Sequence, residues 1–130
     1  MNLTKIKSHF MIHSESPNSE GAVFGGYVID KAVQVAHLAV QEFIEVCFKS
    51  DGEPMKAAAD VFHHFSLVNM DTVSFIAPVR VGDILKMEAK VIFADPKKGL
   101  VRVRACASTM CAHHGIENKL TNIFHMTYRV

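Results

Sequence analysis

The 130-residue sequence contains no tryptophan, only three cysteines and only four prolines. Cys47, Cys106 and Cys111 are odd in number and lack C-x-x-C spacing, which predicts free thiols in a reducing compartment. No apolar run is long enough to span a membrane, and the first residues lack the apolar core of a signal peptide. The formal net charge of +1 gives no electrostatic reason to expect nucleic acid as a partner. We therefore expect an intracellular protein, either cytoplasmic or mitochondrial.

The composition that remains is that of an ordinary globular domain. Hydrophobic residues make up 49% of the chain and charged residues 21%. A chain of this length is expected to form one domain over residues 1–130 with a real core. The chain ends at Arg129-Val130, directly after a strand-like run, which suggests a piece of a longer protein.

A long apolar helix is predicted from about Tyr27 to Phe48. Apolar residues recur there at three- and four-residue steps, and polar residues fill a narrower strip. This pattern predicts that most of the helix is buried, wrapped by a sheet. The apolar positions are Val28, Ile29, Ala32, Val33, Val35, Ala36, Ala39, Val40, Phe43 and Val46.

The period changes to two from Ser66 onward, which predicts a run of antiparallel strands. A short strand is also expected at His9–His13, and a short helix is weakly favoured over a strand at Met55–Phe65. A meander laid around one buried helix is an α+β fold. Its free sheet edge favours dimerisation. The later strands are predicted at Leu67–Ala77, Leu85–Phe93, Val101–Ala107 and Leu120–Tyr128, the last with alternate residues from Leu120 on one face.

Two glycines, Gly25 and Gly26, stand where the helix begins. A helix start has unpaired N–H groups and a partial positive charge, and glycine lets a ligand approach them closely. The pair is therefore a candidate anion or oxyanion site. The alternative is close packing of a turn.

Several fragments taken in order resemble the hotdog-fold acyl-CoA thioesterases, closest to the second half of the mitochondrial-type enzymes built from two hotdog halves. The resemblance implies an α+β hotdog fold, a long central helix wrapped by an antiparallel β-sheet. It also implies that two halves pair, as a homodimer, as part of a larger ring or within one double-length chain. Residues 52–65 are an insertion against this pattern. The fragments are Asn18, Gly21, Phe24-Gly25-Gly26, Asp71–Asp83 and Leu120–Tyr128.

The resemblance implies hydrolysis of a fatty acyl-CoA to free acid and CoA, at an interface between halves and without a cofactor. The helix start at Gly25 and Gly26, beside Phe24, is then expected to bind the thioester carbonyl. Asn18 matches the amide that helps to hold the thioester or the attacking water. The basic residues expected to meet CoA phosphates, unless they are ordinary surface charges, are Arg80, Lys97, Lys98, Arg102 and Arg104.

One position departs from the family pattern. The catalytic Asp or Glu usually lies nine residues after the Phe of Phe-Gly-Gly, and here that residue is Val33. Valine can neither take a proton from water nor attack a thioester. Asp30, about one turn earlier, is either a substitute catalytic carboxylate or a first-turn residue that complements the helix charge.

Two other hypotheses remain open. The chain can be a non-catalytic half that binds acyl-CoA or scaffolds a partner that carries the catalytic acid. It can also be another hotdog enzyme, such as a hydratase or dehydratase, although no acid-plus-histidine motif supports that. The adjacent pairs His63-His64 and His113-His114 lack the spacing of a metal site, and no Gly-x-Ser-x-Gly elbow predicts a serine hydrolase.

Overall fold

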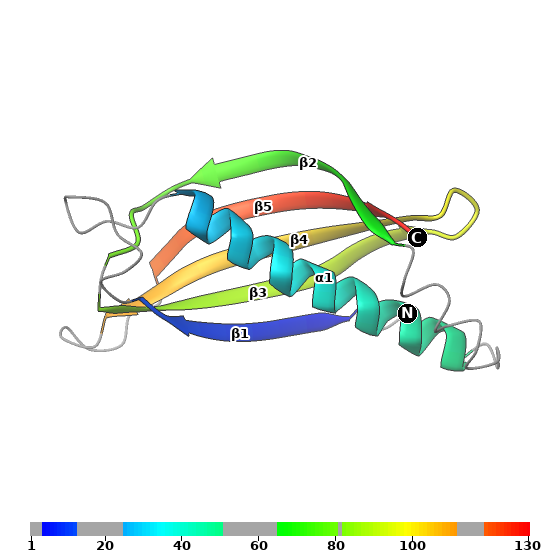
Figure 1. Cartoon of the computed structure of the whole chain (residues 1–130), viewed down its shortest axis with the longest axis horizontal. Coiled ribbons are helices and arrows are strands. Elements are labelled where there is room, and N and C mark those ends of the chain that lie inside the picture. The colour runs from blue at the N-terminus through cyan, green and yellow to red at the C-terminus, as the bar shows by residue number, and fades with distance from the viewer. Residues whose placement is uncertain (1–3, 13–24, 51–64, 81, 112–118) are drawn as a thin grey trace.

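A computed structural model describes residues 4–12, 25–50, 65–80, 82–111 and 119–130. One long helix and five strands make up these residues (Figure 1). In chain order they are β1 (Lys5–Met11), α1 (Gly25–Ser50), β2 (Ser66–Phe75), β3 (Asp83–Asp95), β4 (Leu100–Cys111) and β5 (Lys119–Arg129). Their order agrees with the one the sequence predicts.

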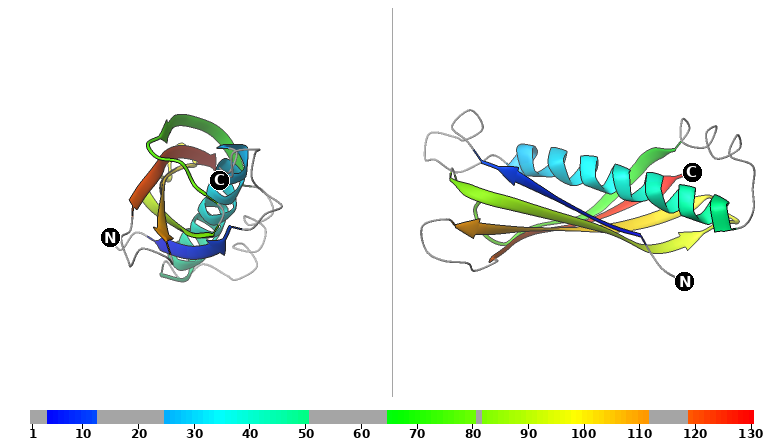
Figure 2. Two further views of the ribbon diagram at one scale, coloured as in Figure 1. Left: turned by 90° about the vertical axis from the view of Figure 1, so that its left-hand side faces the viewer. Right: turned by 90° about the horizontal axis from the view of Figure 1, so that it is seen from below.

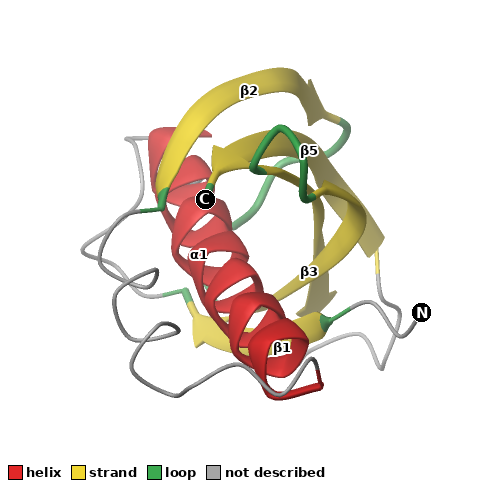
Figure 3. Ribbon diagram, turned by 90° about the vertical axis from the view of Figure 1, so that its right-hand side faces the viewer, coloured by secondary structure: helices red, strands yellow, loops and turns green. Residues whose placement is uncertain are grey.

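The five strands form one antiparallel sheet in the order β1-β3-β4-β5-β2. The sheet curves around α1, and β1 and β2 are its two edges (Figure 3). Within the described residues each edge strand pairs with one neighbour only, which leaves its other side available to a further strand.

The core lies between α1 and one face of the sheet, and α1 packs mainly on β3, β4 and β1 (Figure 2). Ala32, Ala36 and Ala39 are fully buried, so their small side chains let the helix approach the sheet closely. The prediction that most of the helix is buried is wrong. The sheet covers only one face, and the other face is solvent-exposed, including Leu38 at 50% and Val46 at 47%.

The predicted alternation of β5 is correct from Asn122 onward but wrong at its start. Leu120 is 41% exposed, whereas Thr121 and Asn122 are both buried. The cause is a register shift between β4 and β5 at Ala107 and Ser108, which places two consecutive residues of β5 inside. The Thr121 hydroxyl donates to the carbonyl oxygen of Ala107 at 3.2 Å and so satisfies its own polar group there.

Candidate functional site at the start of the helix

The helix begins at Gly25, and Gly26 is exposed. A Cβ atom built on Gly26 meets no atom of the described residues within 4 Å, so these residues leave space beside the first turn. Because the first N–H groups of a helix have no partner inside it, this turn presents donors to whatever occupies that space. The predicted oxyanion site therefore stays a prediction, and the alternative of a closely packed turn involves residues before Gly25 that lie outside the described ones.

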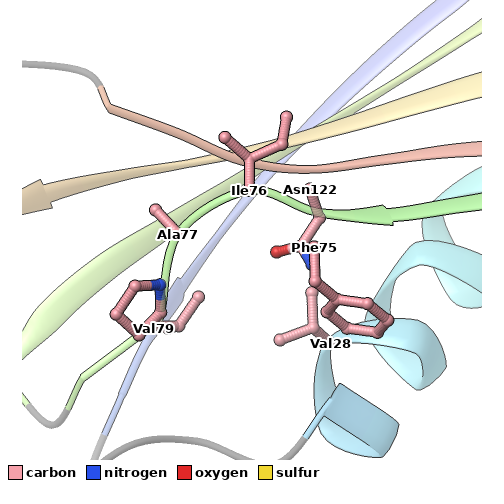
Figure 4. A pocket seen from close by; sticks show the side chains of 7 residues that line it. Val28, Phe75, Ile76, Ala77, Val79 and Asn122 are labelled. Carbon is pink, nitrogen blue, oxygen red and sulfur yellow. The ribbon is translucent and has the colours of Figure 1, made fainter.

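An open hollow of about 250 Å³ lies next to this helix start (Figure 4). Val28 of α1 forms one side, and the segment that follows β2 forms the other. Nearly all of the lining side chains are apolar. They are Val28, Phe75, Ile76, Ala77, Pro78, Val79 and Asn122.

Backbone hydrogen bonds hold the far wall of the hollow in place. The Thr121 carbonyl oxygen accepts from the N–H of Ile76 at 2.7 Å and from that of Ala77 at 3.3 Å. The chain bends at Ala77 and continues to Arg80, whose N–H donates to the Asp83 carboxylate at 3.0 Å. The wall is therefore fixed by the same irregular stretch of β5 that buries Asn122.

Asn122 is the one polar side chain of the lining, and sequence reasoning did not single it out. It is only 2% exposed, and its Oδ1 has no hydrogen-bond partner among the described residues. It pairs with Phe75 in the sheet, so both side chains point toward α1. An asparagine at an inward position of a strand that continues with Phe124, Met126 and Tyr128 is the sequence signal that indicates it.

Asp30 and Val33 differ in exposure: Asp30 faces solvent, whereas Val33 packs against the core. Asp30 is exposed in the second turn of α1, where its Oδ2 accepts from Gln34 Nε2 at 2.9 Å. No acidic residue stands in the first turn, so the expectation that Asp30 complements the helix charge there is wrong. Val33 is half-buried and packs against the core, so the position that carries the acid in the family pattern is apolar here.

The helix near Val33 is tied to the sheet by Tyr128. The buried Tyr128 hydroxyl donates to the Val33 carbonyl oxygen at 3.4 Å, and burial raises the pKa of Tyr128 to about 12. His37 stacks its ring against Phe65 and meets Tyr128 edge-on, with centroid distances of 4.4 and 5.6 Å. Burial lowers the pKa of His37, which favours its neutral form.

The predicted CoA-binding residues do not lie together. Arg80 is exposed, follows the wall of the hollow, and makes no ion pair within the described residues. Lys97 and Lys98 lie at the β3–β4 turn, at the opposite end of the molecule (Figure 1). Arg102 points away from the helix and pairs with Asp71 at 2.6 Å. A single copy therefore brings only Arg80 to the helix start.

Several predicted features lie outside the described residues. These are Asn18, Phe24, the short helix at 55–65 and both histidine pairs.

Within the part that the structure describes, no group of three His, Cys, Asp or Glu residues is arranged to hold a metal ion. None of the described helices is long and apolar enough to cross a membrane. The Cys106 thiol is free.

Comparison with known sequences finds acyl-CoA thioesterases. The chain is 27% identical over 125 residues to the Mus musculus protein named acyl-coenzyme A thioesterase 9, mitochondrial, and the match covers 96% of this chain and 24% of that protein. The chain thus spans about a quarter of the length of the curated relatives it matches. No model of a known protein family matches the sequence.

Comparison with solved structures finds hotdog-fold acyl-CoA hydrolases and so confirms the predicted fold. An acyl-CoA hydrolase from Staphylococcus aureus, in complex with butyryl-CoA and CoA, superimposes with a TM-score of 0.72 at 17% identity. That match covers 97% of this chain and 65% of the other. A hexameric thioesterase from Yersinia pestis has a TM-score of 0.72 at 15% identity, covering 99% of this chain and 86% of the other. The predicted resemblance to acyl-CoA thioesterases is confirmed.

Proposed function

We propose that this chain is a single hotdog domain that hydrolyses acyl-CoA thioesters to free acid and CoA, at an interface between two hotdog halves. The observation that carries the proposal is the open first turn of α1 at Gly26, set beside an apolar hollow. Similarity to proteins named acyl-CoA thioesterases supports the choice of substrate. Those names include the word mitochondrial, which supports an intracellular site of action.

The thioester carbonyl oxygen accepts hydrogen bonds from the N–H groups of the first turn, at Gly25 and Gly26. These donors stabilise the negative charge that develops on that oxygen when water attacks. Asn18 holds the thioester or the water, and Arg80 meets a CoA phosphate at the rim. Lys97, Lys98 and Arg102 can reach the same CoA only from another copy or another half.

The proton of the attacking water needs a base, and Val33 cannot supply one. In a homodimer the carboxylate candidate is Asp30, which is exposed and accepts a hydrogen bond from Gln34. In a double-length protein the other half supplies the acid. The open edge of β2 and the exposed face of α1 are the surfaces on which the two halves pair.

The second candidate is a non-catalytic half that binds acyl-CoA or scaffolds a catalytic partner. Val33 favours it, because the position that carries the acid in the family pattern is apolar and half-buried. The match to only a quarter of each relative also favours a chain that works as part of a larger protein.

One assay distinguishes the two candidates. The purified chain is mixed with acyl-CoAs of increasing chain length, CoA release is followed with a thiol reagent, and binding is measured in parallel by calorimetry. Turnover that Gly26→Val abolishes supports the enzyme. Tight binding without turnover supports the second candidate, and absence of both contradicts each of them.

A further inference from the structure

The hollow beside the helix start contains a polar atom that the described residues leave without a hydrogen bond. Asn122 is 2% exposed, and its Oδ1 finds no partner among the described residues. A buried acceptor without a hydrogen bond is costly, and native structures contain few of them. The stretch that buries it is otherwise well satisfied, since the neighbouring Thr121 uses both its hydroxyl and its carbonyl oxygen. The unpaired amide therefore needs its own explanation.

The shape of the site shows what kind of group fits there. Val28, Phe75 and Val79 surround the amide with apolar surface (Figure 4). Asn122 is the one polar side chain in this lining, and the other lining side chains are apolar. The best occupant is therefore an apolar group that carries one hydrogen-bond donor.

The volume limits the size of that group. A dry protein cavity of about 150 Å³ holds benzene, which has six carbon atoms. The hollow of about 250 Å³ therefore holds a short acyl chain within it, and its open side leaves a longer chain room to extend outward. Val28 in the first turn of α1 lines the hollow, so an acyl chain whose carbonyl is bound at Gly26 can enter it.

We propose that the hollow is the acyl-binding site for short acyl groups that carry a hydroxyl, and that Asn122 Oδ1 accepts the hydrogen bond from that hydroxyl. The inference rests on the proposed function and deepens it by naming the substrate class. Asn122 is a specificity residue: the chain's preference for hydroxylated over plain acyl groups depends on its amide. A site built to bond a substrate hydroxyl rejects the analogue that lacks it, because its own polar group then stays unpaired.

The test compares binding of butyryl-CoA, 3-hydroxybutyryl-CoA, 4-hydroxybutyryl-CoA and free CoA by calorimetry. Binding does not require turnover, so the result stands even if the chain is a non-catalytic half. We expect at least one hydroxylated thioester to bind about tenfold more tightly than butyryl-CoA. Asn122→Leu is expected to abolish or reverse that ratio while leaving the affinity for free CoA unchanged.

Two further variants keep the test decisive. Lys90→Leu introduces a leucine at an exposed site on β3, away from the hollow and from the β2 edge, and should leave the ratio unchanged. Ala77→Leu fills the hollow from its wall and should weaken all acyl-CoAs but not free CoA. Folding is checked by thermal unfolding, where Asn122→Leu should raise the melting temperature by about 2–5 °C because it removes an unpaired buried group.

The contrary outcomes are specific. Equal affinities for plain and hydroxylated thioesters in the wild-type chain overturn the inference but leave acyl-CoA hydrolysis standing. Loss of free CoA binding in Asn122→Leu also overturns it, since the amide would then bond the pantetheine arm. Absence of binding by every thioester overturns both the inference and the proposed function.

Discussion

The two ends of the molecule differ in how completely they satisfy their own polar groups. At the β3–β4 turn, Asp95 Oδ1 accepts from the N–H groups of Lys97 and Lys98, at 3.1 and 3.3 Å. The Val130 N–H donates to the Gly99 carbonyl oxygen at 2.8 Å. At the helix start, by contrast, no described residue lies within 4 Å of a Cβ built on Gly26, and the buried Oδ1 of Asn122 has no partner in the same part of the chain.

We propose that this difference separates an end that serves stability from an end that serves binding. A turn that satisfies its own backbone gains nothing from a ligand. An end that leaves buried or backbone donors and acceptors unpaired loses stability unless something else meets them. The following predictions test this division, beginning with the largest expected effect.

The largest effect concerns the missing acid. Val33→Asp should raise acyl-CoA turnover of the homodimer by about a hundredfold to ten-thousandfold, the usual contribution of a positioned general base. Phe93→Asp is the control, because it adds the same charge to an exposed site on β3, outside the proposed interface. Turnover is measured as thiol release. If Asp30→Asn instead abolishes substantial wild-type activity without loss of stability, Asp30 is the working carboxylate.

The second prediction concerns the apolar surface of each end. We expect at least a dimer, formed through the β2 edge, where Val73 is 38% exposed beside Phe75 at 58%. Val73→Lys should weaken the dimer about a hundredfold, since it places a charge in an apolar interface. Phe93→Lys is the control: Phe93 on β3 is 58% exposed, as Phe75 is, and its replacement should leave the dimer intact. Light scattering across a dilution series measures both, and a monomeric wild type at micromolar concentration contradicts the proposal.

The third prediction compares two glycines. Gly26→Ala should fold normally, because its Cβ meets nothing within 4 Å, yet weaken acyl-CoA binding about tenfold by crowding the first turn. Gly99→Ala should leave binding unchanged but lower the free energy of unfolding by about 1–3 kcal/mol. Gly99 has a φ of 65°, and a Cβ there would lie 3.0 Å from the Val130 carbonyl oxygen. Calorimetry and urea denaturation measure the two effects, and the idea fails if Gly26→Ala binds as the wild type does.

The smallest effect is expected at the Arg102–Asp71 pair, which belongs to neither end. The hydrogen bond from Arg102 holds the pKa of Asp71 below its ordinary value of 3.8. Because the folded pKa is the lower one, the pair stabilises the fold above pH 3.8 and stops doing so as pH falls through the folded pKa. Asp71→Asn should therefore lower the urea midpoint slightly at pH 7, and less so at pH 3. The exposed pair is screened by solvent, so a large shift at pH 7 would contradict this account.

The sequence by itself determined the class of fold and the order of its elements. The three- to four-residue period over α1 and the two-residue period over β3, β4 and β5 each follow from which side chains must leave water. The glycines at the helix start and the missing acid at Val33 could also be identified from the sequence, because backbone freedom and the absence of a carboxylate are properties of the residues themselves.

Only the tertiary structure decided how these elements meet. Periodicity cannot show that the sheet covers one face of α1 and leaves the other open, because exposure depends on what packs from outside the segment. The register shift beside Ala107 leaves Leu120 exposed and Thr121 buried, and no local sequence pattern predicts such a shift. The same shift placed the amide of Asn122 beside Val28 and Phe75, and only three elements meeting in space could form that hollow.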